Sequence, residues 1–266
     1  MANGQNNFKF LSDAEIHSAI HEISENAISP YILPINVMFD LSGSMQPIVD
    51  KALRILEYIK IEFSKIDCPC YAYLILSVIY NCRQTSDTPQ ILYSGFVYDF
   101  DFDDFKLRVK DCYGLTPLVN ALKQVSHYGS LLLDHLDSVA RTHSCPVNIF
   151  VTDYIENVAN DAECHAAIET IQRDIENEQQ LAIEFVLTES QALNSNVDLS
   201  KAVSFGGFRC RYDEQEIKKL IEALKLSTST IFEVGEPQIP STNVPAYNDR
   251  LRRNLIRKMV EYWDHT

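Results

Sequence analysis

The feature of this sequence that most constrains its fold is a series of short apolar runs that alternates with segments of helical periodicity. The runs cover residues 35–39, 71–80, 147–152 and 181–187. Uninterrupted apolar runs are typical of strands buried on both faces of a parallel sheet. Between them, segments such as 47–66 repeat apolar residues every three or four positions, as amphipathic helices do. The alternation predicts an α/β fold with a mostly parallel central sheet and helices on both faces.

Other segments complete this architecture. The run 71–80 is followed, after a polar turn, by a second strand pattern at 90–98, which predicts one antiparallel edge strand. Further helices are expected over 12–26, 102–111, 118–136, 160–179 and 213–226, with a loop after 187. The chain is therefore divided into an N-terminal helical extension (1–30), a main domain (31–235), and a linker with a C-terminal helix that packs on the domain (236–266).

The charge balance restricts the partners of this protein. Its 37 acidic residues exceed its 23 basic residues, which gives a net charge of −14. Such a surface repels nucleic-acid phosphates and anionic lipids, so neither nucleic acid nor membrane is an expected partner. The polar N-terminus lacks the features of a signal peptide, and the odd number of cysteines, seven, favours reduced thiols. These features predict a cytoplasmic protein.

Oxygen-bearing side chains follow two of the predicted strands. Asp40, Ser42 and Ser44 come directly after the first apolar run, at intervals of two residues. The carboxyl edge of an open α/β sheet is where such folds bind ligands. Thr116 stands where a loop enters a predicted helix, and Asp153 follows another predicted strand, so both are expected at the same edge. Carboxylate and hydroxyl oxygens on one tight loop predict a site for a hard divalent cation.

In order and approximate spacing, these five residues resemble the metal-ion-dependent adhesion site of the von Willebrand factor A (VWA) domain family, over roughly residues 31–230. The resemblance implies a Rossmann-like VWA fold. It also implies that the hydroxyls of Ser42, Ser44 and Thr116 touch the ion, while Asp40 and Asp153 act directly or through water. Mg²⁺ is the first expectation, with Mn²⁺ or Ca²⁺ as alternatives. The resemblance further implies that a carboxylate of a partner protein completes the coordination.

Two segments are similar to a narrower group within that family. The Leu41–Met45 loop and the Gly114–Leu118 segment resemble bacterial tellurite-resistance (TerY-like) VWA proteins. This resemblance implies an adaptor in a stress-response or defence system, with a protein kinase and a metal-dependent phosphatase as partners. The sequence departs from the family at Leu115 and Tyr154, where many members have glycine. Tyr154 either narrows access to the ion or offers an aromatic contact to the partner.

The sequence lacks the common catalytic signatures. It contains no phosphate-binding GxxxxGK[ST] loop, no GxSxG elbow and no dinucleotide-binding glycine fingerprint, which favours a binding module over an enzyme. The alternative is a metal-dependent phosphohydrolase, because an aspartate at a strand end also begins the haloacid-dehalogenase motif. That motif carries a second carboxylate as its general acid or base. Ser42 replaces this carboxylate here, which argues against the alternative. A third interpretation gives Asp40 and Ser42 only a capping role for the next helix.

Three other motifs have simpler explanations. His17 and His21 have a spacing that can chelate zinc, but the HExxH pattern of catalytic zinc sites is absent, so an exposed helix face is the favoured explanation. The alternating acidic and phenylalanine residues at 99–104 lack the glycine and distal glutamate of a calcium loop, so they predict a solvated loop with buried rings. Cys68 and Cys70 lack a second pair and are expected to be ordinary thiols.

Overall fold

A computed structural model describes residues 8–23, 31–65, 68, 70–84, 87–139, 141–153, 161–176, 180–187, 208–233 and 257. The strands are β1 (Tyr31–Asp40), β2 (Tyr71–Ile79), β3 (Gln90–Phe96), β4 (Thr142–His143), β5 (Val147–Val151), β6 (Leu181–Val186) and β7 (Phe208–Arg211). The helices are α1 (Asp13–His21), α2 (Val49–Phe63), α3 (Phe102–Arg108), α4 (Leu118–Ser138), α5 (Asp161–Glu176) and α8 (Glu214–Glu233), with 3₁₀ turns η1 (Gly43–Met45) and η2 (Val97–Asp99).

The strands form one sheet in the order β3-β2-β1-β5-β6-β7, with β4 beside the start of β1. Only β2 and β3 pair in antiparallel fashion; the other described pairs are parallel. All ten residues of β1 are buried, as its mostly apolar sequence predicts for a central strand. The α/β prediction, with its single antiparallel edge, is confirmed.

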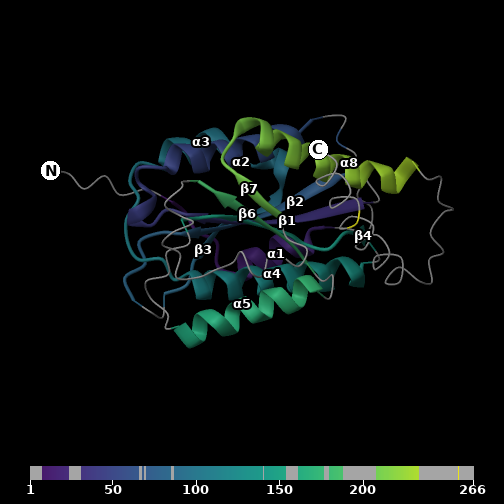
Figure 1. Cartoon of the computed structure of the whole chain (residues 1–266). Helices are drawn as coiled ribbons and strands as arrows, with labels where there is room; N and C mark the ends of the chain where they lie inside the picture. The colour runs from purple at the N-terminus through teal and green to yellow at the C-terminus, as the bar shows by residue number, and fades with distance from the viewer. Residues whose placement is uncertain are drawn as a thin grey trace.

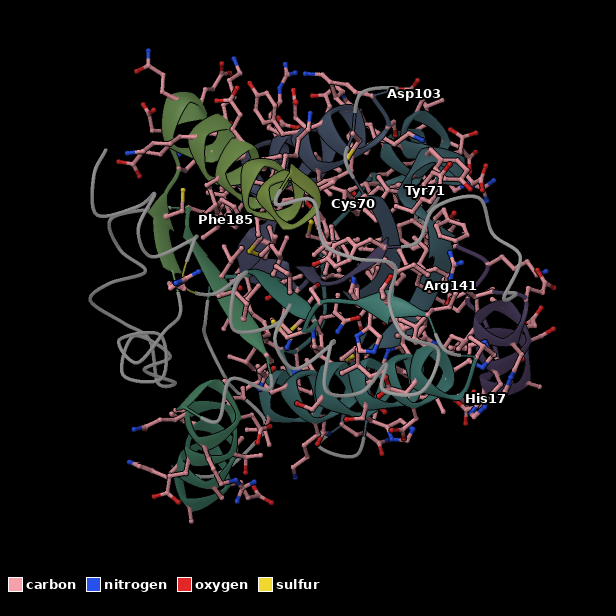
Figure 2. All side chains as sticks on the ribbon, turned by 90° about the vertical axis from the view of Figure 1, so that its right-hand side faces the viewer. His17, Cys70, Tyr71, Asp103, Arg141 and Phe185 are labelled. Carbon is pink, nitrogen blue, oxygen red and sulfur yellow. The ribbon has the colours of Figure 1, made fainter. Side chains whose placement is uncertain are left out.

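Helices cover both faces of this sheet (Figure 1). One face carries α2, α3 and α8, and the other carries α1, α4 and α5. Phe185 of β6 is 1% exposed and belongs to the core on the α8 side (Figure 2). On the opposite face, Ile16 and Ile20 of α1 pack with Tyr73, Leu132 and other residues of β2 and α4. The N-terminal helix thus contributes buried side chains to the core on this face of the sheet.

Several element boundaries differ from the sequence-based expectation. α2 begins at Val49 rather than Pro47, because the chain first makes the η1 turn. β7 lies where a loop was expected, and its edge position explains its polar sequence, since edge strands tolerate charge. The expected helix at the C-terminus lies outside the described residues, apart from Arg257, which is helical.

The simpler explanations of the side motifs agree with the structure. His17 and His21 are exposed on α1, and Figure 2 shows His17 at the surface. Asp101 caps α3 by accepting a hydrogen bond from the Asp104 N–H at 2.9 Å, while Phe100 next to it is buried. No disulfide joins the cysteines of the described residues. Among the described helices, none is both long and apolar enough to cross a membrane.

Candidate metal centre

Two neighbouring strands end with carboxylates at the same edge of the sheet. Asp40 is the last residue of β1, and Thr152 and Asp153 follow β5. Because β1 and β5 are parallel and Phe39 pairs with Val151, the two strand ends lie side by side. Asp40 is 0% exposed and Asp153 is 6% exposed. The register therefore brings together two buried acids that are far apart in sequence.

The carboxylate of Asp40 is oriented by two hydrogen bonds. Its Oδ1 accepts from the Ser42 N–H at 2.7 Å, and its Oδ2 accepts from the Thr152 hydroxyl at 2.6 Å. Thr152 was not among the residues predicted for the site. In the sequence, Thr152 is recognisable only as a small polar residue at the end of an apolar run. Its contact with Asp40 depends on the register of β1 and β5, which the sequence does not show. Thr152 acts as a positioning residue for this carboxylate.

The electrostatics at this edge favour a bound cation. Burial raises the pKa of Asp40 to about 7, and the negative charge of Asp153 adds to the rise. The hydrogen bonds from Thr152 and Ser42 lower the pKa but do not cancel these effects. Among the described residues, the charged group that shifts the pKa of Asp40 is another acid, Asp153. A buried carboxylate beside a second acid is stabilised in its charged form by a nearby positive charge.

The loop after β1 adds two hydroxyls to this edge. The Ser42 and Ser44 Oγ atoms lie 3.3 Å apart, close enough to contact one ion. Ser42 is 1% exposed, whereas Ser44 is exposed at the η1 turn. One hydroxyl therefore belongs to a buried residue of the loop, and the other to an exposed residue at the surface.

A second loop is bound to the first by backbone hydrogen bonds. The Tyr113 N–H donates to the Leu41 carbonyl at 3.0 Å, and the Gly43 N–H donates to the Gly114 carbonyl at 3.3 Å. Thr116 is fully buried two residues beyond Gly114, just before α4 begins. The structure thus places Thr116 on a loop that is hydrogen-bonded to the loop of Ser42.

Gly114 makes this close approach possible. Its φ is +101°, and a Cβ at this position would lie 2.8 Å from the Cys82 N and O atoms. The next residue, Leu115, donates its N–H to the Cys82 carbonyl at 2.8 Å and forms an isolated antiparallel bridge with it. A glycine is therefore required at 114, whereas the extended pairing at 115 accepts the leucine found there. Tyr154 lies outside the described residues.

These donors fit a hard cation better than a soft one. The described residues contain no group of three or more His, Cys, Asp or Glu side chains arranged to hold a metal. The two acids at this edge, Asp40 and Asp153, would need the hydroxyls of Ser42, Ser44 and Thr116 to complete a coordination shell. An all-oxygen set of this kind suits Mg²⁺, Mn²⁺ or Ca²⁺.

Comparison with known proteins gives low similarities. No protein-family model matches the chain, and no curated protein matches its sequence. The PilB minor pilin of Streptococcus sanguinis is 11% identical, with 77% of this chain covered, 64% of the pilin chain covered and a TM-score of 0.44. The chain thus spans less than two thirds of that pilin.

Two further solved structures show likenesses of the same kind. The manganese-loaded TRAP protein of Plasmodium vivax is 14% identical, with coverages of 69% and 70% and a TM-score of 0.40. The vWF domain of the type V pilus tip protein Mfa5 of Porphyromonas gingivalis is 10% identical, with coverages of 80% and 99% and a TM-score of 0.40. Identities and TM-scores this low carry no argument about fold or function. The fold assignment therefore rests on the sheet order and helix layers of the chain itself.

Proposed function

We propose that this chain is a VWA-type protein-binding module that recognises an acidic residue of its partner through a divalent ion. The observation that carries the proposal is the convergence of Asp40, Asp153 and the Ser42–Ser44 hydroxyl pair at the carboxyl ends of β1 and β5. This arrangement supplies two negative charges and several neutral oxygen donors in one place.

The division between charged and neutral donors suits ligand capture. Two carboxylates balance the charge of a divalent ion, whereas hydroxyls are weak donors and leave the ion able to attract a further anionic ligand. Thr152 and the Ser42 N–H hold the Asp40 carboxylate in a fixed orientation. Although the net charge is −14, a bound ion is the largest local charge, so an acidic side chain is attracted at contact distance.

The finer parts of the proposal rest on the sequence. The all-oxygen donor set makes Mg²⁺ the proposed resident ion, and the polar N-terminus with its odd number of cysteines favours the cytoplasm. The resemblance to TerY-like proteins implies a bacterial stress-response or defence system, with a protein kinase and a metal-dependent phosphatase as partners. The module is proposed to have no enzymatic activity of its own, in keeping with the lack of catalytic signatures in the sequence.

The first test is a direct metal titration. Calorimetry with Mg²⁺ and Mn²⁺ on the full chain is compared with Asp40→Asn, Ser42→Ala and, as a matched control, Asp103→Asn on the surface of α3. We expect Asp40→Asn to weaken binding at least about tenfold, because a buried charged ligand is lost. Asp103→Asn is expected to bind normally. Equal affinities in all variants would place the ion elsewhere and contradict the proposal.

The second test asks whether the ion mediates partner binding. Tagged protein is used to retrieve partners from bacterial lysate with Mg²⁺, with EDTA and with the Asp40→Ala variant. A partner lost under both treatments supports a metal-bridged adaptor, whereas a partner retained under both contradicts it. Turnover of p-nitrophenyl phosphate that requires Mg²⁺ and Asp40 would instead support the phosphohydrolase alternative.

A further inference from the structure

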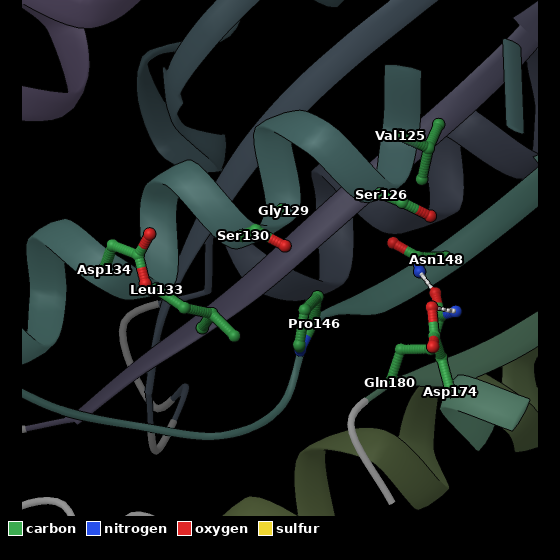
Figure 3. Close-up of a pocket in the computed structure, with 10 residues that line it drawn as sticks. All are labelled: Val125, Ser126, Gly129, Ser130, Leu133, Asp134, Pro146, Asn148, Asp174 and Gln180. Atoms are coloured by element: carbon green, nitrogen blue, oxygen red, sulfur yellow. Dashed lines mark hydrogen bonds between the residues drawn. The ribbon is translucent and has the colours of Figure 1, made fainter. Parts of the chain in front are cut away.

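A second candidate site lies at the opposite edge of the sheet from Asp40. A pocket of about 270 Å³ opens between α4, α5 and the amino ends of β5 and β6 (Figure 3). This volume lies slightly below the range of roughly 300–1,000 Å³ that is typical of small-molecule sites, so it suits a small ligand. Its walls are Val125, Ser126, Gly129, Ser130, Leu133, Asp134, Pro146, Asn148, Asp174 and Gln180.

A one-directional chain of side-chain amides runs along one side of this pocket. The Asn36 amide donates to Asn148 Oδ1 at 2.7 Å, the Asn148 amide donates to Gln180 Oε1, and the Gln180 amide donates to Asp174 Oδ2 at 3.4 Å. Asn36, Asn148 and Gln180 are 1%, 1% and 5% exposed. Buried amides linked in series orient one another and fix the carboxylate at the end of the series.

The charged side chains of the pocket are all negative. Figure 3 shows Asp134 at one end and Asp174, with Gln180, at the other. Among the residues that the structure describes, no Lys, Arg or His lines the pocket. Burial raises the pKa of Asp174, against the effect of the exposed Arg173, whose Nε lies 3.8 Å from it. A cation inside the pocket would favour the charged form of this acid more strongly than a solvated arginine does.

Further polar groups lie between the two acids. The Ser126 and Ser130 hydroxyls point from α4 toward the pocket (Figure 3). Neither hydroxyl, nor the Asp134 carboxylate, has a hydrogen-bond partner among the described residues. The remaining described walls are mostly aliphatic, and none of the described lining residues offers an aromatic ring on which a sugar or a base would stack.

The lining residues of the pocket extend over more than two turns of α4. Asp134 follows Ser126 by eight residues, which corresponds to about 12 Å along the helix axis. A ligand that fits this pocket is therefore linear, with a positive charge at each end for the two acids. It also carries N–H donors for the hydroxyls and methylene groups for the aliphatic walls. We propose that this pocket binds a linear aliphatic polyamine, with its terminal ammonium groups at Asp134 and Asp174. Ammonium–carboxylate hydrogen bonds are stronger than neutral ones, and the charge of −14 concentrates such cations near the protein.

The proposal is tested by calorimetry with spermidine, putrescine and butylamine on the full chain at physiological ionic strength. We expect spermidine to bind most tightly and butylamine, with one ammonium group, most weakly. The Asp174→Asn substitution is expected to lower the affinity for spermidine at least about tenfold. Ser130→Leu tests the pocket without a change of charge, because it fills the space between the two acids, and it should also weaken binding.

Two controls separate this site from general attraction to an acidic surface. Asp103→Asn removes one charge on α3, across the sheet from α1 and α4 (Figures 1 and 2), and should bind spermidine like the wild type. Asp40→Asn should do the same, because the pocket is independent of the metal centre. No binding by the wild type, or equal affinities in all variants with native circular dichroism, would overturn the proposal.

Discussion

The position of Asp40 shows how one residue links function to stability. Its carboxyl is completely buried, and both burial and Asp153 disfavour its charged form. The two hydrogen bonds that orient the carboxylate do not offset this cost, because the pKa remains near 7 rather than at the ordinary 3.8. Without a metal, the protein is therefore destabilised by the group that a metal would use.

This predicts an unusual pH dependence for the metal-free protein. Because the folded pKa of Asp40 is raised, the folded state binds more protons than the unfolded state between the two pKa values. The stabilisation that the protonated Asp40 carboxyl gives to the folded state is thus present at low pH, and it is lost as the pH rises toward and through 7. In EDTA, the free energy of unfolding should fall by roughly 2 to 3 kcal/mol more in the wild type than in Asp40→Asn, between about pH 5 and about pH 8.

Urea denaturation of both proteins at the two pH values checks this expectation. The Asp40→Asn variant removes the titrating group but keeps its size, so it isolates the effect of this carboxyl from that of the other acids. Identical pH dependence in the two proteins would show that Asp40 has an ordinary pKa, and the electrostatic argument for a bound cation would fail with it.

Two glycines at the candidate metal centre are predicted to differ in their tolerance of a side chain. Gly114→Ala should destabilise the protein by roughly 2 to 4 kcal/mol, because its positive φ and its backbone neighbours both exclude a Cβ. Gly43→Ala is the matched control, since its Cβ would meet no atom closer than 3.8 Å. Chemical denaturation measures both. Equal costs would mean that the loop carrying Gly114 rearranges to accept a side chain.

At the scale of elements, α1 shows that an N-terminal helix can belong to the domain core. Its capping box is complete, since the Ser12 side chain accepts from the Glu15 N–H and the Glu15 carboxylate accepts from the Ser12 N–H. Tyr128 of α4 also donates to Asp13 at 2.5 Å. The helix begins through local signals and is then held by contacts with α4 and β3.

We therefore expect mutations of the buried face of α1 to have global effects. Ile20 is 1% exposed, so Ile20→Ala should cost roughly 2 to 5 kcal/mol of stability. Leu107→Ala on α3 is the control, because Leu107 is 76% exposed, and it should change stability by less than about 0.5 kcal/mol. Urea unfolding followed by circular dichroism compares them. A small effect of Ile20→Ala would mean that α1 docks only weakly.

The elements that the sequence predicts best are those whose burial is uniform. β1 and β5 are buried along their whole length, so each appears as a mostly apolar run, with Asn36 in β1 and Asn148 in β5 as its buried polar members. β7 escaped prediction because it has four residues and alternates arginine with Phe208 and Cys210 at the sheet edge. A pattern that short does not distinguish a strand from a loop.

The same reasoning applies to the candidate metal centre. Asp40, Ser42 and Ser44 lie within five residues, so a local pattern was enough to predict that they converge. The contact between Thr152 and Asp40 depends on the parallel register of β1 and β5, which no local pattern contains. Contacts within one loop are thus predictable, whereas contacts between strands require the three-dimensional structure.

At the scale of the whole molecule, the candidate metal centre joins the two central strands of the sheet. An ion held by Asp40 of β1 and Asp153 after β5 would connect elements that lie on either side of the β1–β5 pairing. Because unfolding separates these residues, a ligand that binds only the folded state stabilises the entire domain. The net charge of −14 adds a second effect, since any salt screens repulsion between acidic residues.

These two effects are separated by comparing MgCl₂ with NaCl at equal ionic strength. We expect Mg²⁺ to raise the melting temperature beyond the effect of NaCl, with a stabilisation of about 2.7 kcal/mol when the free ion is at a hundred times its dissociation constant. Asp40→Asn should keep the response to NaCl, which reflects screening, and lose the additional response to Mg²⁺. Differential scanning calorimetry measures both responses. If the extra stabilisation by Mg²⁺ persists in Asp40→Asn, the ion binds at acidic residues other than those between β1 and β5, and the proposed centre is wrong.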